Sequence, residues 1–228
     1  MINNLTISLV IPCHNEEKGI EYLFRYLPKS IDEVIIVDNN CTDRTVEITK
    51  RFGAQIVEEK KPGYGSAYKK GFASVTKDII VTMDGDGTYP IEEINYLVNQ
   101  LINRNLDFIS GNRFPLKDKD SMLSSNKLGN FILSIIFKLL TFKNISDSQS
   151  GMWIFYRSIL NQMNLKSDGM PLSEEIKMEA ILNKKIKFAE IHISYKNRLG
   201  VVKLRKWKDG FDNLIFLFKK RLEIILRK

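Results

Sequence analysis

Short apolar runs rich in β-branched residues alternate with segments of helical periodicity in the early part of the chain. The runs Ile7 to Ile11, Glu33 to Val37 and Asp78 to Met83 each predict a buried strand. Apolar residues at helical spacing fill Glu16 to Leu27 after the first run and Thr42 to Phe52 after the second. Because strands and helices alternate, we expect an α/β fold with a mostly parallel sheet, flanking helices and right-handed crossovers.

The pattern continues with a fourth strand, a loop and a third helix. Gln55 to Glu58 predicts the strand, Lys61 to Gly65 a loop with two glycines, and Ser66 to Val75 the helix. Further along, Ile91 to Asn103 predicts a helix and Phe108 to Gly111 a strand. The alternation of strand and helix therefore extends into the middle of the chain.

Two segments in the later part combine bulky apolar residues at helical spacing with lysine and arginine. They are Phe131 to Leu140, with Ile132, Ile135, Ile136 and Leu139 on one side, and Phe211 to Leu226, with Leu214, Phe218, Leu222 and Ile225. Such a face either packs into a core or lies in the headgroup region of an anionic membrane, and the sequence leaves both open. The apolar stretch from 131 to 142 is interrupted by polar residues and falls short of the roughly 20 residues of a spanning helix, so we expect no membrane crossing.

Three other segments carry less information. Arg113 to Ser125 is polar with few apolar anchors, and we expect a mobile loop there. Glu174 and Glu175 open a predicted helix, where carboxylates complement the helix dipole. His14 and His192 are far apart in the sequence and predict no metal site.

Composition narrows the class of protein. The 228-residue chain has 35 Lys and Arg against 27 Asp and Glu, and its formal charge of +8 suits an anionic partner such as a phosphorylated substrate, a nucleic acid or an anionic lipid. A hydrophobic content of 43% is typical of a globular protein. The two cysteines, Cys13 and Cys41, predict neither a disulfide framework nor a metal-thiolate site. The N-terminus enters a strand-like run directly, so we expect no signal peptide.

Polar and acidic residues gather where the predicted strands end. The first strand ends in residues 12 to 17, the second in residues 38 to 43, and the third in Asp84-Gly85-Asp86. In open α/β sheets, ligands bind beyond the carboxyl ends of the strands. Asp84 and Asp86 are separated by one small residue, so both carboxylates can approach the same hard cation, and Mg²⁺ or Mn²⁺ there would neutralise a diphosphate leaving group. An isolated string of this kind also fits a turn, but three acidic strand ends together favour a cation and ligand site.

The sequences at these strand ends and further along form an ordered set of motifs. They are SLVIPCHNEE at residues 8 to 17, IIVDNNCTDRT at 35 to 45, KPGYGSAYKKG at 61 to 71, VTMDGDGTYP at 81 to 90, GNRF at 111 to 114, DSQSGMW at 147 to 153 and RLGVVKLRKWKDG at 198 to 210. With this set the chain resembles the inverting GT-A glycosyltransferases of family 2, and within them the polyprenyl-phosphate sugar synthases typified by dolichol-phosphate mannose synthase. The resemblance covers nearly the whole chain and implies a Rossmann-like GT-A fold.

The resemblance implies a role for each matching position around the donor. The pocket for the nucleoside base and ribose takes Pro12, Asn15, Glu16 and Asp38, and the loop over the nucleotide takes Gly63 and Gly65. Asp84 and Asp86 match the motif for the metal and the diphosphate, with Asp86 as the stronger ligand for Mg²⁺ or Mn²⁺. Thr88 stands where some relatives carry a metal-binding glutamine, so water would complete the metal shell.

Basic residues are expected around the acceptor phosphate, and they are Arg113, Arg198, Lys203 and Arg205. Arg113 and Lys203, together with Asp86, are the predicted catalytic residues. Val202 replaces the serine of the family's Gly-x-Ser-Lys segment, which removes one phosphate hydrogen bond but keeps the lysine charge. A lipid monophosphate is already anionic near neutral pH, because its second pKa is about 6. The site would then need positive charge and positioning rather than a strong general base.

The function implied is the inverting transfer of a hexose or N-acetylhexosamine from a nucleoside-diphosphate sugar, UDP favoured over GDP, to a polyprenyl or dolichyl phosphate. We expect residues 1–210 to form the catalytic domain and residues 211–228 an amphipathic tail on the membrane surface, with the enzyme cytoplasmic and peripheral on the inner face of the cell membrane.

Two other functions stay open at this point. A family 2 enzyme that extends a saccharide would need a carboxylate base, for which Asp147 is the candidate. A basic α/β module that binds nucleic acid would fit the net charge. The carboxylates at the strand ends would repel a nucleic acid backbone, so we expect no nucleic acid partner.

Overall fold

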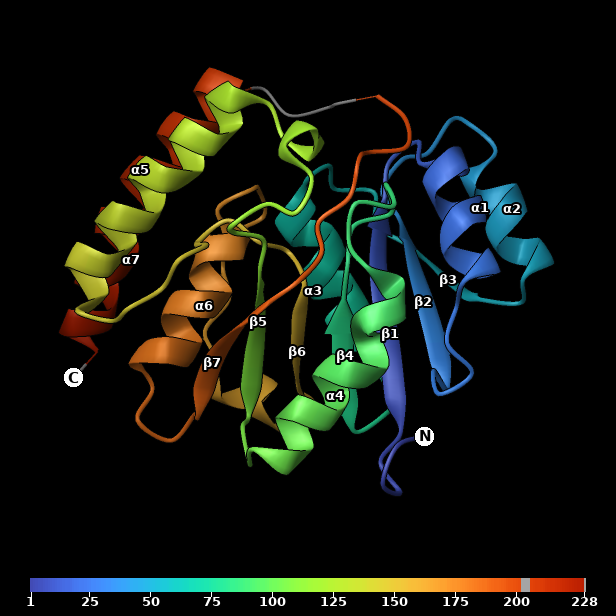
Figure 1. Ribbon diagram of the computed structural model, residues 1–228, viewed down its shortest axis with the longest axis horizontal. Coiled ribbons are helices and arrows are strands. Elements are labelled where there is room, and N and C mark those ends of the chain that lie inside the picture. The colour runs from blue at the N-terminus through green and yellow to red at the C-terminus, as the bar shows by residue number, and fades with distance from the viewer. Residues whose placement is uncertain (202–205, 228) are drawn as a thin grey trace.

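A seven-stranded sheet forms the centre of the protein (Figure 1), with strands in the order β3-β2-β1-β4-β6-β5-β7. The structure is a computed structural model that describes residues 1–201 and 206–227, and the side chains of all of these except 206–209. The strands are β1 Ile7–Cys13, β2 Glu33–Asp38, β3 Gln55–Glu58, β4 Ile79–Thr82, β5 Phe108–Asn112, β6 Trp153–Tyr156 and β7 Phe188–His192.

Most of the strand pairs are parallel, as the alternating pattern predicts. β1 pairs in parallel with β2 and β4, β2 with β3, and β5 with β7. β6 runs antiparallel to both of its neighbours, β4 and β5. The sequence pattern did not predict β6 or β7, because each is a short run inside a longer apolar or mixed segment. The register pairs Cys13 with Asp38 and Val10 with Thr82, so the carboxyl ends of β1, β2 and β4 share one edge.

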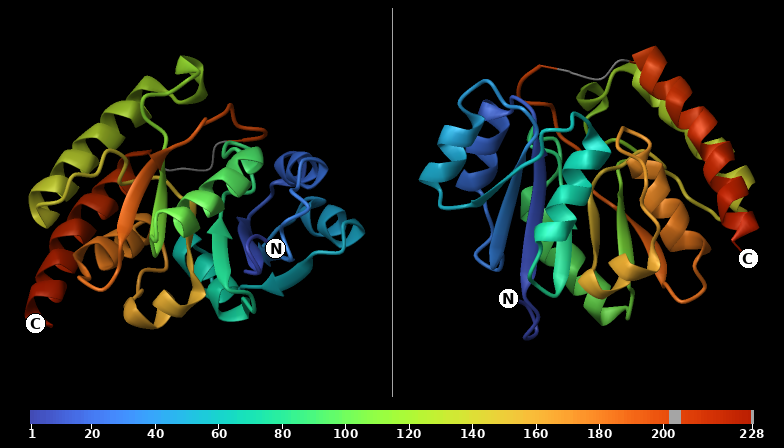
Figure 2. Two further views of the ribbon diagram at one scale, coloured as in Figure 1. Left: turned by 60° about the horizontal axis from the view of Figure 1, so that its bottom comes forward. Right: turned by 180° about the vertical axis from the view of Figure 1, so that it is seen from behind.

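Helices cover both faces of the sheet (Figures 1 and 2). The helices are α1 Glu17–Arg25, α2 Thr45–Arg51, α3 Tyr64–Ser74, α4 Ile94–Asn103, α5 Ser124–Thr141, α6 Leu172–Leu182 and α7 Lys206–Leu226, with 3₁₀ turns at Ile91–Glu93, Lys119–Ser121 and Arg157–Gln162. Residues of α1, α2 and α4 share one buried apolar cluster with the sheet. Residues of α3 and α6 share a second cluster on the opposite face. The two layers bury the sheet on both sides, which explains its near-continuous apolar strands.

A third apolar cluster joins α5, α6 and α7, and α5 lies alongside α7 at one end of the molecule (Figures 1 and 2). The buried residues of this cluster are Leu133, Phe137, Ile145, Met178, Leu217 and Ile224. The predicted boundary between residues 210 and 211 falls inside α7, which is one continuous helix. Helix α7 is therefore docked on the same body as the sheet.

The apolar stripe that the sequence shows on each of these helices is mostly exposed. On α7, Phe218, Leu222 and Ile225 are 54%, 57% and 51% exposed, whereas Leu217 and Ile224 are buried. On α5, Ile132, Ile135 and Leu139 are likewise exposed. Both helices carry apolar residues on two sides, so spacing alone did not identify the side that packs. No helix among the described residues is long and apolar enough to cross a bilayer.

Candidate functional site

The ends of β1 and β2 are tied together by side chains from the predicted donor pocket. Asn15 has a left-handed backbone, with φ of 57°, and its side-chain oxygen accepts hydrogen bonds from the backbone N–H groups of Thr42 at 2.6 Å and Asp43 at 3.2 Å. Asp38 accepts one from the backbone N–H of Cys41 at 2.8 Å. Pro12 lies within β1, paired with Val37 of β2. The geometry brings all three predicted positions to the same edge of the sheet.

Asn39 is a buried residue of this edge that sequence reasoning missed. Its amide nitrogen donates to the carbonyl oxygens of Glu59 at 2.7 Å and Lys61 at 2.9 Å, and its oxygen accepts from the N–H of Gly63 at 2.9 Å. Three bonds from one side chain fix the glycine loop relative to β2. The first of two consecutive asparagines after a strand was the available signal, since a buried amide must find partners.

The two glycines of the loop are required by a close backbone contact. A Cβ on Gly65 would lie 2.3 Å from the carbonyl oxygen of Ser167, and a Cβ on Gly63 would lie 2.3 Å from that of Asp168. Gly63 also has a φ of +142°, which side-chain-bearing residues rarely adopt. The packing of segment 167–168 thus explains both glycines, and their predicted role over the nucleotide stays a prediction.

Asp84 lies after β4 among buried tyrosines. Its carboxylate accepts a hydrogen bond from the Tyr68 hydroxyl at 3.4 Å, and Tyr64 and Tyr89 are close enough to be perturbed by its charge. Burial raises the pKa of Asp84 to about 7, and the charge of nearby Asp86 adds to this. Two neighbouring carboxylates are costly to ionise together, and a bound cation would compensate their combined negative charge.

Asp86 has partners on both of its carboxylate oxygens. One oxygen accepts from the backbone N–H of Thr88 at 2.9 Å and from its hydroxyl at 2.6 Å. The other accepts from Arg198 at 2.7 Å, and Arg198 also donates to Glu16 at 2.7 Å. The predicted donor and acceptor residues Glu16, Asp86 and Arg198 therefore meet in one ion cluster. Thr88, noted in the sequence as an exchange for glutamine, orients Asp86.

Arg113 is buried and held by Asp147. Its Nε and Nη2 donate to the two carboxylate oxygens at 2.7 Å and 2.8 Å, and its backbone N–H also donates to Asp147. Burial alone would raise the pKa of Asp147, but the charge of Arg113 outweighs it and holds that pKa below the usual value. Lys177, fully buried, donates to the carbonyl oxygen of Asp147 at 2.9 Å. Arg113 thus lies at the base of the site rather than in an open loop.

Asp147 is a poor general base in this arrangement. It is fully buried, both of its oxygens are engaged by a guanidinium, and its proton affinity is lowered. A general base must be within hydrogen-bond reach of its substrate and have a pKa near the working pH. This arrangement argues against Asp147 as the base that the saccharide-extending alternative would need.

Glu175 lies in the first turn of α6, as predicted, and also belongs to a buried ion cluster that the sequence did not indicate. It is fully buried and pairs with Lys220 of α7 at 2.7 Å, while Lys220 also pairs with Glu179 at 2.6 Å. The other oxygen of Glu175 accepts from the backbone N–H groups of Lys166 at 2.9 Å and Ser167 at 2.7 Å. Helix α7 is thereby linked to the segment that packs on Gly63 and Gly65.

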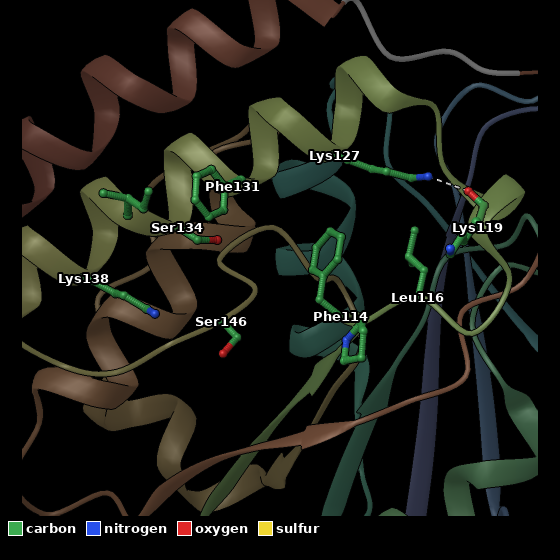
Figure 3. Close-up of a pocket in the computed structure, with 10 residues that line it drawn as sticks. Phe114, Leu116, Lys119, Lys127, Phe131, Ser134, Lys138 and Ser146 are labelled. Atoms are coloured by element: carbon green, nitrogen blue, oxygen red, sulfur yellow. Dashed lines mark hydrogen bonds between the residues drawn. The ribbon is translucent and has the colours of Figure 1, made fainter.

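A cavity of about 600 Å³ lies beside this site, between α5 and the segment that follows Arg113 (Figure 3). Its lining is mainly apolar, with lysines among the apolar groups: Phe114, Pro115, Leu116, Lys119, Lys127, Phe131, Ser134, Ile135, Lys138 and Ser146. Ser134 accepts a hydrogen bond from the N–H of Ser148, the residue after Asp147, at 3.0 Å. The cavity therefore adjoins the buried Arg113–Asp147 pair.

Two of the predicted site residues, Lys203 and Arg205, lie outside the described residues. In the described ranges, no three His, Cys, Asp or Glu side chains converge as a metal site. A metal held by Asp84 and Asp86 would therefore have to take its other ligands from a diphosphate and water, as Mg²⁺ commonly does.

The sequence model of one protein family, described as Glycosyl transferase family 2, matches residues 8–163 of this chain. Low-salt glycan biosynthesis hexosyltransferase Agl6 of Haloferax volcanii is 31% identical over 219 residues, which cover 93% of this chain and 53% of that protein. The chain thus spans about half the length of that relative. Dolichyl-phosphate hexose transferase of the same organism is 29% identical over 207 residues, which cover 90% of this chain and 89% of that protein.

Among solved structures, the fold is similar to that of glucosyl-3-phosphoglycerate synthase from Mycobacterium tuberculosis, in complex with Mn²⁺, UDP-glucose and phosphoglyceric acid. The TM-score is 0.77 at 18% sequence identity, over 96% of this chain and 80% of that chain. This similarity confirms the predicted GT-A fold. With the family model matched over most of the chain, the protein belongs to glycosyl transferase family 2.

Proposed function

We propose that this protein transfers a hexose or N-acetylhexosamine, with inversion, from a nucleoside-diphosphate sugar to a polyprenyl phosphate. The observation that carries the proposal is the contrast between the pair Asp84 and Asp86 on one side and Asp147 on the other. Asp84 and Asp86 lie at the strand edge where the family binds its donor, whereas Asp147, the candidate base, is locked to Arg113. An acceptor that is already anionic needs no such base.

A divalent cation, Mg²⁺ or Mn²⁺, would be held by Asp86 and Asp84. The fit rests on this chain's own residues, because Asp84 is forced to a pKa of about 7 by burial and by its neighbour's charge. When bound, the cation would neutralise charge on the diphosphate leaving group. The solved structure with Mn²⁺ and UDP-glucose supports this assignment and favours UDP as the donor nucleotide.

The chain's other residues would orient the two substrates. Asn15 and Asp38 shape the edge proposed for the nucleoside, and Asn39 holds the adjoining loop. In the reaction, an acceptor phosphate oxygen attacks the anomeric carbon from the face opposite the diphosphate, whose bond to that carbon breaks. The positive charge of Arg113 and Arg198 at the base and the edge of the site would reduce the repulsion between two anionic substrates.

The cavity beside the site fits an acceptor with an anionic head and an apolar chain. Phe114, Leu116, Phe131 and Ile135 supply apolar walls, and lysines such as Lys138 lie among them (Figure 3). A saccharide acceptor would instead favour a polar lining of hydrogen-bonding groups. One relative is named dolichyl-phosphate hexose transferase, and this name supports the same class of acceptor for the present chain.

We further propose that the outer face of α5 and α7 rests on an anionic membrane, on the inner side of the cell membrane. Eight large apolar side chains there are 40% to 76% exposed: Phe131, Ile132, Ile135, Leu139, Phe218, Leu222, Ile225 and Leu226. Lysines and arginines on the same two helices, Lys138, Lys219 and Arg221 among them, suit an anionic headgroup layer. A water-exposed apolar surface of this kind marks an interaction site.

Flotation with vesicles tests the membrane surface. The intact protein should float with vesicles of phosphatidylcholine and phosphatidylglycerol at low salt, and Phe218→Ser with Leu222→Ser should abolish most of this binding. Tyr96→Ser, which removes a similarly exposed aromatic from α4, is the control and should bind as the wild type does. Failure of the wild type to float, or equal binding by the double variant, would contradict the docking.

A radiolabel transfer assay tests the function itself. Labelled UDP- and GDP-sugars are incubated separately with Mn²⁺, the protein and a polyprenyl phosphate in detergent, and the organic phase is counted. The proposal predicts organic-phase label that depends on the polyprenyl phosphate. Label that instead enters an oligosaccharide, with none in the organic phase, would establish the saccharide-extending alternative.

A further inference from the structure

The segment from Tyr195 to Val201 crosses the carboxyl edge of the sheet directly over Asp86. Two backbone hydrogen bonds hold it there, from the N–H of Lys196 to the carbonyl oxygen of Thr88 at 2.8 Å and from the N–H of Leu199 to that of Asp86 at 2.9 Å. The Leu199 side chain packs on Gly87, where a Cβ would lie only 3.1 Å from it. Asp86 is consequently only 2% exposed.

This segment also delivers a positive charge to the carboxylates. The Arg198 guanidinium donates through Nη1 to Asp86 and through Nη2 to Glu16, each at 2.7 Å. The two acceptors come from the ends of different strands, β4 and β1, so the guanidinium bridges the edge of the sheet. An arginine cannot give up its proton in a protein, so this positive charge is permanent.

One carboxylate oxygen of Asp86 accepts a hydrogen bond from Arg198. This oxygen cannot bind Arg198 and a divalent cation equally well at the same time. The other oxygen of Asp86 is already used by the N–H and hydroxyl of Thr88. A cation that approached the oxygen facing Arg198 would meet the guanidinium at short range, and the two positive charges would repel each other. One of them must give way for the other to bind.

We propose that Arg198 is an exchangeable counter-ion for the metal site. Without donor, its guanidinium neutralises Asp86 and Glu16; when the cation and diphosphate bind, the guanidinium leaves Asp86 and turns to a phosphate oxygen. The backbone of segment 195–201 stays in place, because it is hydrogen-bonded to Asp86 and Thr88, and the Arg198 side chain alone turns. This inference rests on the proposed function and specifies how the site avoids holding two uncompensated carboxylates between turnovers.

The exchange has a measurable signature in binding. The cation alone must displace Arg198, so it binds weakly, whereas nucleoside diphosphate offers the released guanidinium a new partner. Mn²⁺ and UDP should therefore bind cooperatively. Replacing Arg198 by an uncharged side chain should strengthen the binding of Mn²⁺ alone and weaken the binding of UDP in the presence of Mn²⁺. A residue with a merely structural role would not move the two affinities in opposite directions.

The experiment is a titration of Mn²⁺ followed by electron paramagnetic resonance, with and without UDP, together with calorimetric titration of UDP at saturating Mn²⁺. For Arg198→Met we expect Mn²⁺ alone to bind roughly tenfold more tightly and UDP roughly tenfold more weakly than in the wild type, the scale of one charge-assisted hydrogen bond. Arg198→Lys should lie between the two. Arg25→Met removes an exposed arginine of α1 and should match the wild type.

The outcomes separate this inference from the proposed function. Unchanged Mn²⁺ affinity in Arg198→Met, in a protein whose wild type binds Mn²⁺ with UDP, would overturn the exchange alone. No Mn²⁺ binding by the wild type with either UDP or GDP would overturn the metal part of the proposed function and the exchange with it. If Arg198→Met does not fold without Mn²⁺, the intermediate affinities of Arg198→Lys decide the question in the same way.

Discussion

Lys220 offers the sharpest test of how helix α7 is held, because it is a buried cation between two carboxylates. Its ammonium donates to Glu175 at 2.7 Å, to Glu179 at 2.6 Å and to the carbonyl oxygen of Asn164 at 2.7 Å. Lys220 and Glu175 have no exposed side-chain surface, and Glu179 has only 8%. Lys220→Met keeps most of the length of the side chain but leaves Glu175 without its cation, whereas Glu179 keeps its ion pair with Arg227 at 2.8 Å.

Removing one partner of a buried ion pair costs about 3–5 kcal/mol, because the remaining charge stays buried and uncompensated. With a urea m-value of about 3 kcal/mol/M, the unfolding midpoint should fall by about 1–1.7 M. The assay is urea unfolding at pH 7.5 followed by circular dichroism. Lys219→Met, on the exposed side of the same helix, should change the free energy of unfolding by no more than about 0.5 kcal/mol.

A rescue variant isolates the cause. If uncompensated charge is responsible, adding Glu175→Gln to Lys220→Met should restore part of the lost stability, because Glu175 is the carboxylate that loses its cation. Equal unfolding midpoints for Lys220→Met and Lys219→Met would refute the reasoning and show that α7 is not fixed by this cluster. Because Glu175 also holds the backbone of residues 166 and 167, Lys220→Met should loosen the contact with the glycine loop.

Two further predictions concern the site itself. The pKa of Asp84 is raised from its usual value of 3.8 to about 7, so its stabilising contribution is complete below the unfolded pKa and is lost as the pH rises through the folded one. In EDTA, the urea unfolding midpoint of the wild type should therefore fall relative to that of Asp84→Asn as the pH is raised from about 4 to 7. Midpoints of the two proteins that change with pH in parallel would contradict this. Gly65→Ala should destabilise by about 1–3 kcal/mol because its Cβ would meet the Ser167 carbonyl. Gly129→Ala, a helical glycine with open space around it, should instead gain up to about 1 kcal/mol, and equal effects in urea unfolding would refute the contact.

Much of the fold could be predicted because its signals are local. β3 has the predicted bounds, Gln55–Glu58, and β1, β2 and β4 differ from prediction only at their ends. Each of these strands is an apolar run closed by polar residues, which needs no information from elsewhere in the chain. The position of Asp84 and Asp86 at the shared edge follows from the same signal, since parallel strands align their carboxyl ends.

The contacts that define the site could not be predicted in the same way. Arg198 is 112 residues from Asp86 and 182 residues from Glu16, and Arg113 is 34 residues from Asp147. No periodicity within a segment reports such pairs. The side of α7 that packs could not be chosen from the sequence for a related reason, because both of its sides are apolar and only the neighbouring helices decide between them.

The proposed reaction is a transfer of sugar that depends on a cation held by Asp86. Its most direct test is the rate at which label from a nucleoside-diphosphate sugar enters the organic phase with polyprenyl phosphate, for the wild type with Mn²⁺, the wild type with EDTA, and Asp86→Asn shown to be folded by thermal unfolding. We expect rapid transfer by the wild type with Mn²⁺. Both the wild type with EDTA and Asp86→Asn should lose roughly 100-fold or more of this rate. Full transfer by Asp86→Asn, or by the wild type in EDTA, would contradict this expectation.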